Sequence, residues 1–158
     1  MKQHRGGAPV GYVAELEPVE AGAVLYLRLW SDGGYAQNQM EEEFMAALGV
    51  HQGRQAVKSF DSLCALCAQH GRRPLMRHHL NCKCLGADES CFANFIGYAS
   101  ECEREDALLI AMTLVTPHVA PVLLGLAEDF GLALRRMVTR ERGPADRMDK
   151  PSPSAMIH

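Results

Sequence analysis

Hydrophobic and polar residues alternate near the start of the chain in a way that predicts two β-strands. In residues 23–30 leucines occupy three alternate positions, with other residue types between them. This is the period of two expected of a half-buried strand. Residues 12–16 look like a partner strand, so we expect a β-hairpin within residues 11–30. Because an isolated hairpin is marginal in water, it must lie on helices or pair with a second copy of itself, and the second arrangement would be a homodimer.

Beyond Gly34 the apolar residues recur every three or four positions, which predicts a bundle of about five helices within residues 35–140. The first expected helix ends at Leu48, and the second covers residues 53–70. The third begins at an Asp88 N-cap, and the fourth and fifth cover residues 100–115 and 121–140. Residues 71–87 show neither period and are expected to form a long loop rich in cysteine and histidine. The predicted fold class is therefore α+β, mostly α.

The length of 158 residues, or 17.4 kDa, suits one domain with a substantial core. We expect the globular part to cover residues 9–142. Residues 1–8 are polar and glycine-rich and are predicted to be a flexible arm. Residues 143–158 are polar with three prolines and are predicted to be a flexible tail.

Composition excludes several classes of protein. With 47% hydrophobic residues, 22% charged residues and a formal charge of −3, the chain has the balance of an ordinary globular protein. A basic nucleic-acid coat is excluded, and nucleic-acid binding is not expected because a reading motif and interleaved aromatics are missing. No apolar stretch approaches the roughly 20 residues needed to cross a bilayer, and the first twenty residues contain no signal-peptide core. We therefore expect a cytoplasmic protein that does not enter membranes.

Cysteine usage points to metal or thiol chemistry. Five of the six cysteines lie between positions 64 and 91, and a cytosolic protein would keep them reduced. The spacings Cys64-x2-Cys67, Cys67-x2-His70 and Cys82-x-Cys84 are all compatible with chelation. The predicted zinc ligands are Cys82 and Cys84 with two further donors from Cys67, His70 and His78, and Cys64 and His79 are the substitutes.

Four protein ligands would make a closed, structural zinc site, because catalytic zinc keeps one position open. Such an ion would order the loop over residues 71–87, because packing alone does not offset the entropy that this loop loses when it becomes ordered. For Cys64 and Cys67, on the apolar side of a helix, burial in the core is an equal alternative. Cys91 and Cys102 are interpreted as packing residues.

Three arginines, Arg72, Arg73 and Arg77, stand out in the same loop of a slightly acidic protein. Guanidinium groups bind phosphates, carboxylates and acidic partners. The alternative is a solvated loop in which these arginines pair with nearby carboxylates such as Asp88 and Glu89.

Signatures of known enzyme classes, including phosphate-binding loops and nucleophile elbows, do not occur in the sequence. We therefore expect a zinc-binding, cytoplasmic binding or regulatory module, recognising a protein partner or a small anionic ligand, rather than an enzyme. The first alternative is a thiol-based redox or iron–sulfur protein. The second is a metalloenzyme with an open zinc position.

Overall fold

The computed structural model describes residues 9–141, so the predicted arm (1–8) and tail (143–158) lie outside the described part. Its elements are β1 (Pro9–Tyr12), a 3-10 turn η1 (Val13–Glu15), α1 (Pro18–Ser31), α2 (Gly34–Leu48), α3 (Val50–His70), β2 (Cys84–Gly86), α4 (Ala87–Ser100), α5 (Arg104–Leu114) and α6 (Ala120–Glu141). The predicted fold class, α+β and mostly α, is confirmed, and the two strands form a small antiparallel sheet. Within this part of the chain no helix has both the length and the apolar composition to span a bilayer.

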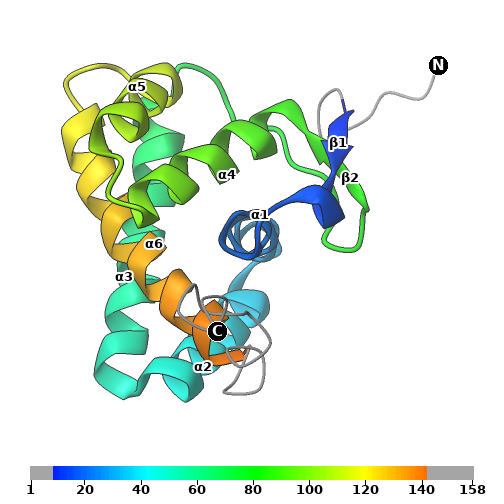
Figure 1. The fold of residues 1–158 in the computed structure, drawn as a ribbon. Helices are drawn as coiled ribbons and strands as arrows, with labels where there is room; N and C mark the ends of the chain where they lie inside the picture. Colours follow the sequence, from blue (N-terminus) through cyan, green and yellow to red (C-terminus); the bar gives the residue numbers. More distant parts are fainter. Residues whose placement is uncertain (1–8, 142–158) are drawn as a thin grey trace, which may run out of the picture.

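Helix α1 occupies the middle of the bundle. Figure 1 looks along its axis, with α4 above it, α2 below it, and α3 and α6 on the left. The small sheet lies on the right, beside the start of α4. A segment this central must be apolar on most sides, which is why its sequence is unusually rich in leucine and valine.

The predicted hairpin over residues 11–30 is wrong, because its second strand is part of α1. Pro18 stands in the first turn, where its missing N–H is harmless. The buried residues Val19, Ala23 and Leu27 follow the helical spacing of four. The alternate leucines do not mark a strand face, since Leu25 and Leu29 lie outside the buried set. The extra helix also explains why the bundle has one helix more than expected.

Strand β1 instead pairs with β2, more than seventy positions later in the chain. The strands are antiparallel, with Gly11 opposite Leu85 and Tyr12 opposite Cys84. The pairing continues beyond β1, where the Val13 N–H donates to the Lys83 carbonyl at 2.9 Å. A long-range pairing of this kind leaves no local turn signal in the sequence.

Aromatic rings from four helices form the centre of the core. Phe60 of α3 packs against Phe130 of α6 with ring centroids 4.5 Å apart, and against Phe92 of α4 at 6.4 Å. Phe44 of α2 stacks on Phe130 at 5.8 Å. Helices α2 and α3 approach so closely that a Cβ at Gly53 would lie 2.5 Å from the backbone nitrogen of Met45. Only glycine fits this crossing.

Two predicted helix boundaries shift in ways that matter for the site. Asp88 is not the N-cap of α4. The cap is Gly86, and Asp88 lies inside the first turn. Ser100 does not begin the next helix but ends α4, where its buried hydroxyl donates to the Gly97 carbonyl at 2.7 Å. The predicted loop over 71–87 is correspondingly shorter, because its last residues form β2 and the start of α4.

Candidate functional site

Residues 72–83 cross the molecule without helix or strand, and we call this segment the strap. A single buried arginine anchors its end. The Arg28 side chain, 1% exposed, makes two contacts with the Glu89 carboxylate, from Nε at 2.6 Å and from an Nη at 2.9 Å. The same guanidinium donates to the carbonyls of Cys82 and Cys84, both at 2.8 Å. Arg28 therefore ties α1, α4 and the strap together.

Glu89 completes this buried network. Its carboxylate also accepts the backbone N–H of Gly86 at 3.0 Å and that of His78 at 3.3 Å. Burial alone would raise the pKa of Glu89. The hydrogen bonds and positive charge of Arg28, together with the backbone donors, outweigh burial and hold the pKa below its ordinary value. The carboxylate is therefore ionised at neutral pH and compensates the Arg28 charge.

A second carboxylate holds the middle of the strap. Asp88, nearly buried, pairs with both terminal nitrogens of Arg73 and accepts the Met76 N–H at 2.8 Å. At the strap's beginning, Arg72 donates a backbone N–H to Leu114 at 3.0 Å and a side-chain N–H to the Met112 carbonyl at 2.9 Å. These contacts supply the order that sequence analysis assigned to a metal ion.

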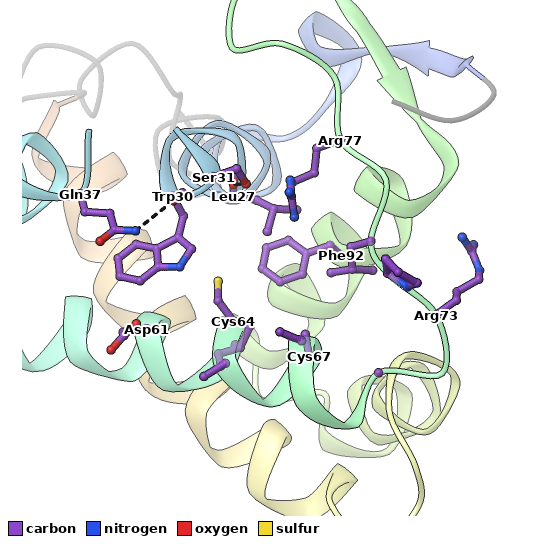
Figure 2. Close-up of a pocket in the computed structure, with 16 residues that line it drawn as sticks. Leu27, Trp30, Ser31, Gln37, Asp61, Cys64, Cys67, Arg73, Arg77 and Phe92 are labelled. Atoms are coloured by element: carbon purple, nitrogen blue, oxygen red, sulfur yellow. Dashed lines mark hydrogen bonds between the residues drawn. The ribbon is translucent and has the colours of Figure 1, made fainter. Parts of the chain in front are cut away.

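A cavity of about 640 Å³ opens between α1, α3 and the strap. Figure 2 shows its aromatic walls, Trp30 from α1 and Phe92 from α4, with the Cys64 side chain of α3 pointing between the two rings. Arg77 reaches in from the strap on the opposite side. The rest of the lining is mixed: Leu27, Leu63, Cys67 and Leu75 are apolar, whereas Ser31, Gln37, Asp61 and Arg73 are polar.

The two α3 thiols are poor nucleophiles in this setting. Burial, followed by the neighbouring Cys67 and Asp61, raises the pKa of Cys64 well above its ordinary value, against an opposing effect of Arg77. Burial raises the pKa of Cys67 to about 11. Both side chains are therefore protonated at neutral pH and present neutral, polarisable surface to the cavity.

The three arginines predicted to bind an anion have different contacts in the structure. Arg72 and Arg73 make contacts that hold the strap in place. The pairing of Arg73 with Asp88 is the alternative that the sequence analysis gave for this arginine. Arg77 lines the cavity, and no carboxylate in the described part of the chain forms an ion pair with it. Its charge is therefore available to a ligand in the cavity.

The predicted zinc ligands come from separate places. Cys67 is buried on α3, and His70 ends that helix, where its ring lies edge-on to His118 at 5.7 Å. His78, Cys82 and Cys84 belong to the strap and the start of β2. Within residues 9–141 no three or more His, Cys, Asp and Glu side chains gather in an arrangement that could hold a metal. Zinc binding itself stays a prediction.

Three residues that organise the site, Arg28, Trp30 and Phe92, were not predicted from the sequence, and neither was the anchoring role of Asp88 and Glu89. One signal was available. A single arginine within the apolar run of residues 23–30 must be paired if that run is buried on all sides, and the Asp-Glu pair at a helix start is a suitable partner.

Comparison with known proteins gives no family. No protein-family description, no curated protein and no solved structure matches this chain. The function is therefore inferred from the site alone.

Proposed function

We propose that this protein is a binding module that holds a small amphipathic anion in the cavity between α1, α3 and the strap. The observation that carries the proposal is the cavity itself, with its two aromatic walls and the Arg77 guanidinium. Small-molecule sites are usually concave pockets of a few hundred Å³ that combine apolar and aromatic walls with polar groups that orient the ligand.

The arrangement favours a ligand with an apolar body and a negative head. Trp30 and Phe92 offer flat surfaces for a ring or a chain. Arg77 offers a fork of donors suited to a carboxylate, sulfonate or phosphate. The protonated thiols of Cys64 and Cys67 add apolar surface. Their raised pKa values also favour binding over thiol–disulfide exchange at this pair.

The protein carries its own reporter for this site, because Trp30 is the only tryptophan in the chain. We propose titrating the full chain with the anionic dye 8-anilinonaphthalene-1-sulfonate while recording tryptophan quenching and energy transfer to the dye. Saturable one-to-one binding with quenching of Trp30 is expected. Binding should weaken about tenfold in Arg77→Gln and with added salt, since a charge contact is lost or screened.

A variant in which a larger side chain fills the cavity tests the proposal directly. Ala68 is exposed on α3 and lines the cavity, so Ala68→Phe should occupy the space without removing any contact of the core. Ala46→Phe on α2 is the matched control, an exposed helical alanine away from the cavity. Undiminished dye binding by Ala68→Phe, or equal loss in both variants, would contradict the proposal.

The redox, iron–sulfur and open-zinc alternatives concern the thiols and can be separated from the cavity. An iron–sulfur cluster gives the purified protein visible absorbance, whereas zinc is colourless. Elemental analysis of protein purified without added metal distinguishes zinc from iron. Neither measurement depends on whether the cavity holds a ligand.

A further inference from the structure

We call Cys82, near the end of the strap, and Cys84, the first residue of β2, the strap pair. The backbone fixes their relative position. The carbonyls of Cys82 and Cys84 both point to Arg28, while the carbonyl of Lys83 between them points the other way, to the Val13 N–H. Carbonyls alternate between the two edges only in an extended strand. Residues 82–84 are therefore extended, and the side chains of Cys82 and Cys84 lie on the same face.

That face is directed away from the core. Leu85, the next residue, is buried against Val24 and Ala93, so Cys84 points to the opposite side of the strand. Tyr12, directly opposite Cys84 in the sheet, is exposed. Both cysteines are themselves half-buried rather than enclosed. The two thiols form an adjacent, accessible pair on a segment that Arg28 holds rigid.

From this geometry we propose that Cys82 and Cys84 are half of a zinc site, completed by the same two cysteines of a second copy of the chain. Structural zinc takes four tetrahedral ligands, and thiolates are among its preferred ones. One chain supplies two on one face, and the part of the chain that the structure describes offers no cluster with a third donor. A two-fold axis through the ion supplies the other two without any new residue type.

Zinc binding at this pair is coupled to proton release. Zn²⁺ bound by four thiolates carries a net charge of −2 after four protons leave for solvent. The proposal is independent of ligand binding in the cavity.

The test is a titration of the full-length, metal-free, reduced protein with Zn²⁺, followed by sedimentation. Half an equivalent of zinc per chain should bind and convert monomer to dimer, and excess chelator should reverse the change. Replacement of Zn²⁺ by Co²⁺ should give the thiolate-to-metal absorbance of a tetrahedral sulfur site. Failure to bind zinc, or one zinc per chain on a monomer, would overturn the proposal.

The variants locate the site. Cys82→Ser with Cys84→Ser should abolish both zinc binding and dimerisation while leaving the circular dichroism spectrum unchanged, because neither side chain is in the core. Cys64→Ser with Cys67→Ser is the matched control and should retain both properties. Should that control not fold, Cys102→Ser serves, since Cys102 is exposed on the turn after α4. Loss of zinc in a control, or its retention in the strap variant, would place the ion elsewhere and refute the assignment.

Discussion

The helical core and the strap are ordered by different forces. The core is held by apolar contact among phenylalanines from four helices, which depends on area and shape and little on direction. The strap buries little of itself and is held by two carboxylates, Asp88 and Glu89, that meet arginines and backbone N–H groups. The core should therefore respond to changes of volume, and the strap to changes of charge.

The largest effect is expected from truncating the core. Phe60 is fully buried and contacts Trp30, Phe92 and Phe130, so Phe60→Ala leaves a cavity at the centre of the aromatic cluster. We expect it to lower the free energy of unfolding by about 3–5 kcal/mol. Urea denaturation followed by circular dichroism measures this. The loss should be similar at pH 5 and pH 7, since no charge is involved, and a strongly pH-dependent loss would contradict the distinction.

Removal of the buried negative charge should be nearly as costly but should differ with pH. Glu89→Gln keeps the shape and leaves the Arg28 charge buried without compensation, which typically costs about 3–5 kcal/mol. The pKa of Glu89 is lower in the folded protein than in the unfolded chain. Such a carboxyl group adds stability above its unfolded pKa, and that stability is lost as the pH falls through the folded value.

Stability of the wild-type protein should therefore fall on acidification, and part of this fall should be missing in Glu89→Gln. Urea denaturation from pH 7 down to pH 3 measures both curves. Glu42→Gln, at an exposed position of α2, is the matched control and should change stability by less than about 0.5 kcal/mol. Parallel pH curves for wild type and Glu89→Gln would show that Arg28 does not depend on this carboxylate.

A smaller and more local effect is expected at the second carboxylate. Asp88→Asn removes the charge that pairs with Arg73 and keeps one oxygen that can accept the Met76 N–H. We expect a loss of about 1–3 kcal/mol, because a nearly buried group loses charged hydrogen bonds. Amide hydrogen exchange should show faster exchange in the strap and unchanged exchange in α3 and α6. Uniformly faster exchange would mean that the strap and the core unfold together.

These two regions also mark how far the sequence could predict the structure. Helices in the core follow from apolar spacing, and α3 and α6 lie within three residues of their predicted bounds. The strap was predicted as irregular, but its anchors were not, because Arg28 and Glu89 are 61 positions apart and no periodicity links them. The strand predicted over residues 23–30 failed because most residues of α1 are at least partly buried, so its leucines at alternate positions imitate a period of two.

The candidate site was predictable only in part for the same reason. Clustering of cysteine, histidine and arginine indicated the strap as the unusual segment. A cavity, in contrast, arises from elements that meet only in the fold, so Trp30 and Phe92 carried no signal of their role. Spacing also did not separate the two cysteine pairs. In the structure burial raises the pKa values of Cys64 and Cys67, and Cys67 is the one of these four cysteines that is fully buried.

The reactivity of the cysteines provides a chemical measurement of their difference in burial. At pH 8 about one Cys67 thiol in a thousand is ionised if its pKa is about 11, and the side chain is also buried. Cys82 and Cys84 are more accessible. Iodoacetamide labelling of the metal-free protein, followed by mass spectrometry, should modify the strap pair at least about tenfold faster, a difference of about 1.4 kcal/mol. Equal rates in the folded protein would contradict the burial difference, and equal rates in urea are the expected control.

The smallest effect is expected where the strap's network reaches solvent. The Arg73 side chain is 65% exposed although its partner Asp88 is nearly buried, so water and salt screen the pair. Arg73→Gln should therefore cost no more than about 1 kcal/mol, well below the cost of Asp88→Asn, because Asp88 keeps the Met76 N–H as a donor. Urea denaturation at low and at high salt measures the pair, and the difference between wild type and Arg73→Gln should shrink as salt is added. A loss equal to that of Asp88→Asn, unaffected by salt, would mean that the Arg73 charge acts as a buried one, and the strap would then be as enclosed as the core.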